Sequence, residues 1–498
     1  MRSPTGLEPT SVRVFGDGPG AVLTGDHWFD VPLDHAEPGR HHLRVYAREV
    51  RLRALADVDQ PYLVFLQGGP GGRSPRPGTD APGWLAWALA RYRVILLDQR
   101  GTGRSTPVDR HTLATLADAA RLAQPQGSGG RAAARRQADY LAHLRADAIV
   151  ADAEVVRRGL LGDQPWTVLG QSFGGFCTWT YLSHHPQGLA AAYVTGGVPP
   201  LGAHADDVYR ATWRAVQRRT RDLDEAHPGV REGLAHVARH LERVPEYLPT
   251  GERLGVARLQ EVGVVLGGAG GIDRLAHLVD DAWAVPGESL SDTFLHGVAE
   301  IVSYATRPLY ALVHEACYAD AGMVTAWSAQ RVREHLGVPT APVGDTTSGQ
   351  RREVLPLTGE MVYPHTVIAD PALAPLASAA HDLAAREWSR PLYDADRLAA
   401  NTVPVAAMIY TQDMYVDPEL SRRAAAATGA VTLLEDDQLH HDGLRRAGAS
   451  VLDRLAEALG DAAAPPTRPA PTPAAQPSRT ASAPAGLSAS PAPAGAPS

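Results

Sequence analysis

One turn constrains the fold of this chain more than any other feature: an apolar run that ends in the pattern Gly-x-Ser-x-Gly. Residues 167–175 read TVLGQSFGG, which places Ser172 between Gly170 and Gly174. A buried strand that leads into a helix through such a turn holds the serine on a strained elbow. Glycines flank the serine because a Cβ atom there would collide with the neighbouring strand and helix. The turn therefore predicts a serine hydroxyl exposed at the carboxyl edge of a sheet.

The pentapeptide alone is weak evidence for a nucleophile. At average glycine and serine usage the pattern arises by chance in roughly one chain of this length in six, and this chain holds 48 glycines. The alternative is a glycine-rich start of a helix that carries no chemistry. The case for a nucleophile therefore depends on what the rest of the chain supplies.

Alternation of strands and helices around this turn predicts a parallel sheet that helices cover on both faces. All-apolar strands are expected at 61–66 and 93–97, a helix with one apolar face at 149–160, and a further strand at 190–195. Strand, helix and strand in this order are typical of an α/β fold. Residues 1 to about 60 alternate apolar and polar side chains, which predicts an antiparallel edge of the sheet.

The alternation disappears between about 203 and 385, where apolar residues recur at helical spacing. Strand character returns at 403–410 and 431–434, so the intervening stretch is expected to be a helical cap inserted between two parts of one sheet. Beyond about 463 the chain is mostly Pro, Ala, Ser and Thr, which cannot bury enough apolar surface to offset chain entropy. The expected organisation is a core segment at 1–202, a cap at 203–385, a second core segment at 386–462 and a disordered tail at 463–498.

Composition excludes several classes of function. The chain has no lysine, so its 47 basic residues are all arginine, and neither a Schiff-base lysine nor a P-loop lysine is available. The two cysteines, Cys177 and Cys317, are too few for a zinc cluster or a disulfide framework. The formal charge of −8, without a basic block, argues against nucleic acid as a partner. We expect neither a metal nor a cofactor.

The sequence also predicts where the protein resides. No apolar run approaches the about 20 residues that a membrane span needs, and residues 1–6 lack the apolar segment of a secretory signal. We therefore expect a cytoplasmic protein without a membrane partner.

A second glycine-rich turn follows the strand at 61–66, where residues 67–72 read QGGPGG. Backbone N–H groups exposed in such a turn can hold a phosphate or the oxyanion of an acyl-transfer intermediate. A phosphate loop would have the spacing G-x-G-x-x-G and lead directly into a helix, whereas Pro70, Pro75 and Pro77 make this loop irregular. The irregular loop therefore favours binding of an oxyanion over binding of a phosphate. The alternative is a tight turn that binds no ligand.

Three motifs in a fixed order carry a family resemblance: residues 67–72, residues 98–105 with the sequence DQRGTGRS, and residues 170–175. Together they resemble the proline iminopeptidases, which are serine aminopeptidases of the α/β-hydrolase fold. The likeness spans roughly 60–200 and 400–450, with a cap inserted where the family places its own. The resemblance implies an α/β-hydrolase fold and an enzyme that releases N-terminal residues, proline preferred, through an acyl-enzyme.

A serine nucleophile needs a carboxylate and an imidazole, and this fold supplies them in the order Ser, Asp, His. After the expected strand at 403–410, residues 411–418 match the loop that bears the family's acid, which falls on Asp413. Asp417 is the competitor, but it immediately precedes Pro418 and can serve as the cap of the next helix.

The base is expected after the last strand, where two histidines stand side by side. His441 fits the family's position, just before a loop-to-helix transition, better than His440 does. The oxyanion hole should use the backbone N–H of Phe173, the residue after the nucleophile, and that of Gly69 in the glycine-rich loop.

An exopeptidase must recognise a free α-amino group, and the resemblance implies carboxylates that project from the cap for this purpose. The candidates are Glu315 and Glu360, which both stand among apolar or aromatic residues. An ordinary salt bridge within the cap is the alternative for either residue.

Three functions remain possible at this point. The first is a serine aminopeptidase acting on peptides. The second keeps the same triad but acts on an ester, lactone or amide without a free amine. The third is a non-catalytic binding protein on the same fold, since a fold does not fix function. The presence of Ser172, Asp413 and His441 together argues against the third.

Overall fold

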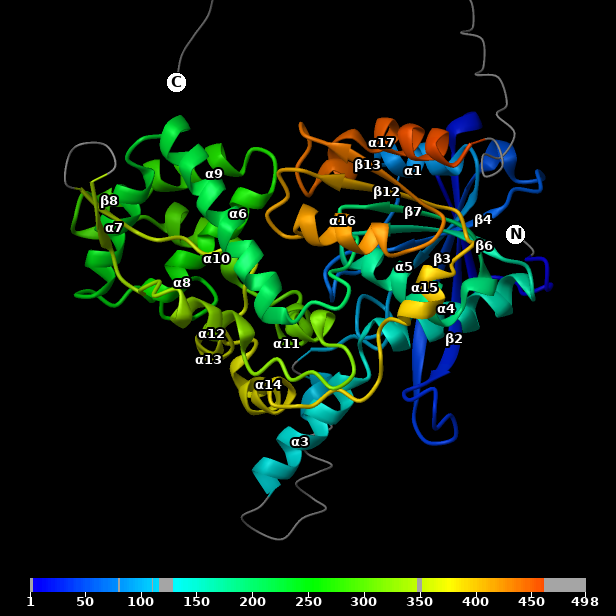
Figure 1. Cartoon of the computed structure of the whole chain (residues 1–498), viewed down its shortest axis with the longest axis horizontal. Helices are drawn as coiled ribbons and strands as arrows, with labels where there is room; N and C mark the ends of the chain where they lie inside the picture. The colour runs from blue at the N-terminus through cyan, green and yellow to red at the C-terminus, as the bar shows by residue number, and fades with distance from the viewer. Residues whose placement is uncertain (1–2, 79–80, 110, 116–128, 347–351, 461–498) are drawn as a thin grey trace, which may run out of the picture. The chain divides into compact units, whose positions relative to one another are not determined.

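The computed structural model describes residues 3–78, 81–109, 111–115, 129–346 and 352–460 (Figure 1). The tail predicted at 463–498 lies outside the described residues. None of the helices described is both long and apolar enough to cross a membrane.

One nine-stranded sheet organises the described residues. The first three strands are antiparallel to their neighbours, and the remaining six run parallel to one another. In spatial order the strands are β1 (Ser11–Phe15), β2 (Val22–Pro32), β3 (His42–Leu52), β5 (Arg93–Leu97), β4 (Tyr62–Leu66), β6 (Trp166–Gln171), β7 (Leu189–Thr195), β12 (Val405–Tyr410) and β13 (Val431–Asp436). The predicted parallel sheet with an antiparallel N-terminal edge is confirmed.

Helices cover both faces of this sheet, because successive side chains of each central strand point to opposite faces. On β4, Val64 packs into one hydrophobic cluster and Phe65 into another. The helices on the Val64 face are α4 (Ala146–Leu161), α5 (Phe173–His184), α15 (Ala395–Ala399) and α16 (Pro418–Ala426), and those on the Phe65 face are α1 (Gly83–Leu89) and α17 (Gly443–Leu459) (Figure 1).

The stretch between β7 and β12 is mainly helical, as its periodicity predicts. Before α15, its helices are α6 (Ala205–Ala226), α7 (Val230–Leu241), α8 (Val256–Gln260), η4 (Glu261–Gly267), α9 (Gly271–Asp280), α10 (Asp292–Val302), α11 (Pro308–Val313), η5 (Glu315–Tyr318), α12 (Ser328–His335), α13 (Pro364–Ala369), η6 (Ala374–Leu376) and α14 (Ala377–Ala384). Two short hairpins pair β8 (Trp283–Val285) with β9 (Ser289–Leu290) and β10 (Val343–Asp345) with β11 (Arg352–Val354).

This insertion has two packing environments. Side chains of α6 to α10 form a hydrophobic cluster of their own, to which Leu234 and Phe294 belong. Leu309 of α11 and Leu383 of α14 instead join the cluster on the sheet, where α14 also packs against α3 (Gly129–Ala142). The boundaries at 202 and 385 therefore stay predictions, since apolar packing runs across them.

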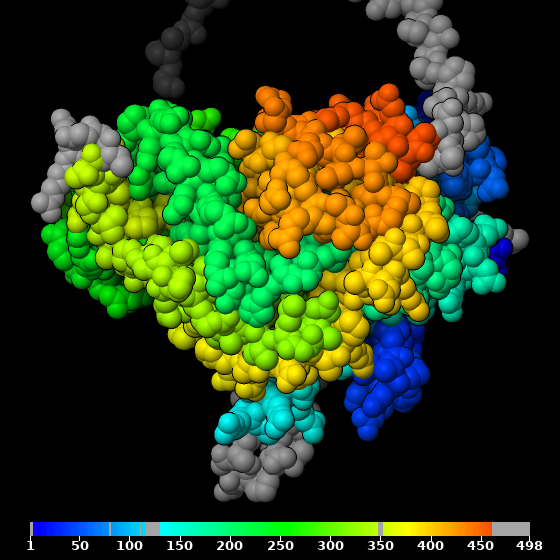
Figure 2. Space-filling view, in the orientation of Figure 1, coloured from blue at the N-terminus to red at the C-terminus, as the bar shows by residue number. Residues whose placement is uncertain are grey.

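The insertion meets the second core segment directly. In Figure 2 the green surface of the insertion adjoins the orange surface that follows β12. Met414, in the loop after β12, is buried within the cluster of the insertion. The loop that carries the predicted acid is thus packed against the insertion.

Candidate active site

The backbone of Ser172 has the strained geometry that the turn predicts. Its φ of 53° and ψ of −125° lie in a region that L-residues rarely adopt. The turn is held by hydrogen bonds from the Ser172 N–H to the Thr195 carbonyl (3.0 Å) and from the Gly175 N–H to the Ser172 carbonyl (2.7 Å). A Cβ atom at Gly174 would lie 1.9 Å from the Leu66 carbonyl oxygen, so a larger residue cannot occupy this position.

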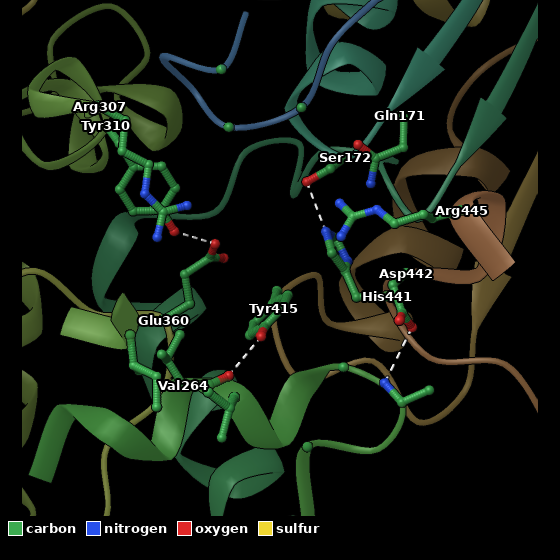
Figure 3. A pocket seen from close by; sticks show the side chains of 18 of the residues that line it. Gln171, Ser172, Val264, Arg307, Tyr310, Glu360, Tyr415, His441, Asp442 and Arg445 are labelled. Atoms are coloured by element: carbon green, nitrogen blue, oxygen red, sulfur yellow. Dashed lines mark hydrogen bonds between the residues drawn. The ribbon is translucent and has the colours of Figure 1, made fainter. Parts of the chain in front are cut away.

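Hydrogen bonds join three side chains from distant parts of the chain. His441 Nε2 lies 2.8 Å from Ser172 Oγ, and His441 Nδ1 lies 2.8 Å from Asp413 Oδ2 (Figure 3). Because Nδ1 donates to the carboxylate, Nε2 is the unprotonated nitrogen that accepts from the serine hydroxyl. The structure brings together the three residues in the arrangement of a Ser-His-Asp triad.

Neighbouring groups hold the Asp413 carboxylate in place and determine the pKa of His441. Asp413 is buried, and its other oxygen, Oδ1, accepts from the backbone N–H groups of Tyr415 (2.8 Å) and Val416 (3.1 Å). Burial lowers the pKa of His441, but the charges of Asp413 and Glu360 and the Asp413 hydrogen bond raise it. The net pKa is above that of an ordinary imidazole.

The alternative candidates for the acid and the base, Asp417 and His440, do not belong to the triad. Asp417 caps α16, because its Oδ1 accepts from the N–H groups of Glu419 (3.1 Å) and Leu420 (2.9 Å). His440 does not line the cavity at Ser172, and its pKa is lowered by burial and by the charge of Arg219.

Ser172 and His441 open onto a cavity of about 540 Å³ between the sheet and the insertion. The glycine-rich loop after β4 forms one wall, so Gly69 lies beside the serine as expected. Phe173 begins α5 directly after the nucleophile, and its ring is buried against Phe176. Both predicted oxyanion-hole residues are therefore adjacent to Ser172, one in the cavity wall and one in the chain.

Glu360 is the predicted carboxylate that reaches this cavity. Its Oε1 accepts a hydrogen bond from the Tyr310 hydroxyl of α11, and its Oε2 lies 3.9 Å from His314 Nε2. The side chain is 17% exposed, so it can meet a ligand in the cavity. Burial raises the pKa of Glu360, but the contacts with His314, His441 and Tyr310 outweigh burial and hold the pKa below its ordinary value. Glu360 is consequently an anion at neutral pH.

Glu315 differs from the expectation, because it does not line the cavity that contains Ser172. It is 8% exposed in a separate small pocket, and its Oε1 accepts from the Ala329 N–H (3.0 Å) in the first turn of α12. A carboxylate at a helix N-terminus satisfies an otherwise unpaired backbone donor. The structure therefore gives Glu315 a capping contact within the insertion, and burial raises its pKa.

The cavity is also lined by residues that the sequence did not identify as site residues, among them Arg307, Tyr310, Tyr415 and Arg445. Tyr310 and Arg307 come from the start of α11, Tyr415 follows Asp413 by two residues, and Arg445 follows His441 by four. Tyr415 and Arg445 could have been found by their closeness to the predicted acid and base. Tyr310 and Arg307 carry no such signal, since only tertiary packing brings α11 to the cavity. In the part of the chain that the structure describes, no group of three or more His, Cys, Asp or Glu could hold a metal ion.

Comparison with known proteins agrees with this geometry. The family model described as the alpha/beta hydrolase fold matches residues 61–250. A proline iminopeptidase of Aeromonas sobria is 40% identical over 430 residues, which cover 86% of this chain and 95% of that protein. The proline iminopeptidase aneH of Aspergillus aculeatus is 30% identical over 457 residues, which cover 89% of this chain and 95% of that protein. A tripeptidyl aminopeptidase of Streptomyces lividans is 25% identical over 186 residues, 34% of each chain.

The similarity to two proline iminopeptidases runs through the core and the insertion alike, over nearly the whole of both relatives. Together with the sheet topology, it confirms the predicted α/β-hydrolase fold. The chain is a serine hydrolase and belongs to the proline iminopeptidase family.

Proposed function

We propose that this protein is a serine aminopeptidase that releases N-terminal residues, proline preferred, from peptides. The observation that carries the proposal is the joint presence, in one cavity, of Ser172 bonded to His441 and of the anionic carboxylate of Glu360. The Ser172–His441 pair supplies acyl-transfer chemistry, and the Glu360 carboxylate supplies a partner for a protonated amine. The names of the two long relatives support the same activity.

Ser172, His441 and Asp413 have the following roles in the proposed reaction. Ser172 Oγ attacks the carbonyl carbon of the first peptide bond while His441 Nε2 takes its proton, and Asp413 stabilises the imidazolium. The carbonyl oxygen becomes an oxyanion, which the N–H groups of Phe173 and Gly69 stabilise. The C–N bond then breaks, and His441 returns the proton to the departing amine. Water, deprotonated by His441, attacks the acyl-enzyme and releases the N-terminal amino acid.

The proposed amine site consists of Glu360, with Tyr310 fixing the orientation of its carboxylate. An ammonium that enters an enclosed cavity loses its hydration, so a nearby anion has to compensate it. Glu360 is the predicted carboxylate that lines the cavity, whereas Glu315 does not. Apolar groups of Val264, Ile301 and Tyr310 on the cavity wall suit a proline ring beside that ammonium.

A panel of substrates tests the activity. Prolyl and other aminoacyl 4-nitroanilides should be hydrolysed, with the prolyl compound fastest, while N-acetylprolyl 4-nitroanilide should react poorly because it has no ammonium. The alternative function is that of an esterase, lactonase or amidase acting on a small molecule without a free amine. Fast hydrolysis of simple esters with no cleavage of any aminoacyl amide would replace the aminopeptidase proposal with that one.

We also propose a cytoplasmic location. Both cysteines are free and buried, which suits a reducing compartment. Cell fractionation with an antibody to the chain would test it, and recovery of the protein outside the cell would contradict it.

A further inference from the structure

Arg445 stands on the wall of the active-site cavity, across from Glu360. It is the third residue of α17, the helix that begins directly after the His441 loop. Figure 3 shows its side chain extended toward the Ser172–His441 pair, while Glu360 and Tyr310 lie on the other side of the serine. Arg307 also lines the cavity on the Glu360 side, where its guanidinium lies over the Tyr310 ring, so Arg445 is a cation on the far side of the nucleophile from Glu360.

Nothing among the described residues pairs with the Arg445 guanidinium, which has neither a hydrogen bond nor an ion pair there. Arg422 and Arg454 of the same core segment are paired, with Glu435 and Asp436 respectively, whereas Arg446, like Arg445, is exposed and has no partner among the described residues. The neighbouring carboxylate, that of Asp442, accepts from the Ala269 N–H (3.2 Å) of the insertion.

The position is also unfavourable for a cation by itself. The first turn of a helix carries the positive end of the helix dipole, so a basic residue there weakens the helix slightly. An anion bound at Arg445 would meet both the guanidinium and the positive helix end. The five N–H donors of a guanidinium suit a carboxylate, which they can bind in a two-point contact.

A short peptide has the matching charges. Its ammonium lies on the amino side of the first peptide bond, and in a dipeptide its carboxylate lies one residue beyond that bond. One residue of extended chain covers roughly 3.3–3.6 Å, so both charged ends of a dipeptide fall within a single small cavity. In a longer peptide the carboxylate moves away from the reacting carbonyl by that distance for every added residue.

We propose that Arg445 binds the free C-terminal carboxylate of dipeptide substrates and makes the enzyme selective for them. This inference rests on the proposed aminopeptidase function, because it takes the ammonium to lie at Glu360 and the scissile carbonyl at Ser172. Arg445 then contacts the residue that leaves, so it determines specificity on the leaving-group side of the bond. The class of substrate is a dipeptide with an N-terminal proline and an unblocked carboxylate.

Three substrates that differ at the leaving group test the inference: prolyl-alanine, prolyl-alaninamide and prolyl 4-nitroanilide. The wild-type enzyme should prefer the free acid over the amide by about 10- to 100-fold in kcat/KM, as expected for a charge-assisted hydrogen bond. Arg445→Gln should abolish this preference. Its kcat/KM for prolyl-alanine should fall, while kcat/KM for prolyl-alaninamide and prolyl 4-nitroanilide should stay within about twofold of wild type. Arg445→Lys, which keeps the charge, should retain part of it.

Arg446→Gln is the matched control. Arg446 is exposed and is the next residue of the same helix, but it does not line the cavity. Its substitution should leave all three rates unchanged. Circular dichroism and the melting temperature should establish that each variant is folded.

The outcomes separate the two proposals. If the wild-type enzyme cleaves prolyl 4-nitroanilide but does not distinguish the acid from the amide, the role of Arg445 is overturned and the aminopeptidase function stands. The role is also overturned if Arg445→Gln slows the acid and the amide equally. If the wild-type enzyme cleaves none of the three substrates, the proposed function and the inference fail together.

Discussion

The hydroxyl of Tyr415 donates a hydrogen bond of 2.6 Å to the carbonyl oxygen of Val264 (Figure 3). Tyr415 belongs to the loop that carries Asp413, and Val264 belongs to η4 of the insertion. The ring of Tyr415 also packs edge-on against the His441 ring, with centroids 4.8 Å apart. The insertion is therefore bound to the same loop that orients the catalytic base.

Replacing Tyr415 with phenylalanine should loosen this connection without removing the ring against His441. A neutral hydrogen bond contributes about 1 kcal/mol net, so KM for an aminoacyl amide should rise about fivefold. The rate of a small ester, which needs only the triad, should stay near the wild-type value. Steady-state kinetics on both substrates would check this, and an equal loss on both would show that Tyr415 acts on His441 itself.

Gly267→Ala should damage the same contact more severely. A Cβ atom at Gly267 would lie 2.2 Å from Cζ of Tyr415, so the ring or η4 has to move. We expect a lower melting temperature and a loss of peptide cleavage larger than that of Tyr415→Phe. Gly255→Ala is the control, because a Cβ atom there meets nothing within 4 Å. A melting temperature equal to that of the control would refute the predicted clash.

Ser172→Ala should leave the fold intact and lower turnover by several orders of magnitude, as loss of a triad nucleophile does. The backbone strain at this position is independent of the hydroxyl, so the melting temperature should change little. Turnover of prolyl 4-nitroanilide and the melting curve are the measurements. A variant with near-normal turnover would contradict the assignment of the nucleophile.

Asp413→Asn should be far more damaging than Asp417→Asn. Of the two aspartates, Asp413 is the one that hydrogen-bonds His441, and asparagine there favours the wrong imidazole tautomer, which lowers kcat by about 10⁴ in enzymes of this type. Asparagine at 417 remains a good helix cap, so that variant should be close to wild type. Comparing kcat of the two variants tests which aspartate orients His441. A larger loss in Asp417→Asn than in Asp413→Asn would assign that role to Asp417.

Glu360→Gln should lower kcat/KM for aminoacyl amides by about 10- to 150-fold, because it removes the charge that meets the ammonium. Hydrolysis of a small ester without an amine should stay nearly unchanged. Glu315→Gln is the matched control and should leave both activities unaltered, since Glu315 caps α12 away from the cavity. Equal losses on amide and ester in Glu360→Gln would instead mean that the residue supports the cavity structure.

The pH dependence follows from the raised pKa of His441. The base works in its neutral form, so the acid limb of kcat/KM should lie above the pKa of an ordinary imidazole. Glu360→Gln removes one of the charges that raise this pKa, so the limb should move to lower pH. A pH series on the amine-free ester measures the limb without interference from a substrate amine. A shift to higher pH in the variant would contradict the direction.

Several elements could be predicted because local sequence dictates them. The elbow at Ser172 needs flanking glycines whatever the rest of the fold does, and the apolar runs at 61–66 and 93–97 suit strands buried on both faces. Asp417 could be recognised as a helix cap from the proline that follows it. These features depend on neighbours in the chain, so the sequence shows them directly.

The positions of the two glutamates depend on tertiary packing, which local sequence does not determine. Glu315 and Glu360 have similar apolar neighbours in sequence, yet one caps a helix and the other faces the cavity. Their difference arises from how α11 and α12 pack, which periodicity does not report. The contacts of Tyr310 with Glu360 and of Tyr415 with Val264 join residues 50 and 151 positions apart, and no local pattern encodes them.

The sheet order also dictates when this enzyme becomes active during its synthesis. β12 lies between β7 and β13, but the ribosome makes it only after the whole insertion. A chain in which β7 had formed before β12 was made would expose β7 as an edge with unpaired backbone groups, on which nascent chains can associate. Ser172 has then been translated, whereas Asp413 and His441 have not. The triad is therefore incomplete until residue 441, which follows β13, has been translated and β12 and β13 have joined the sheet.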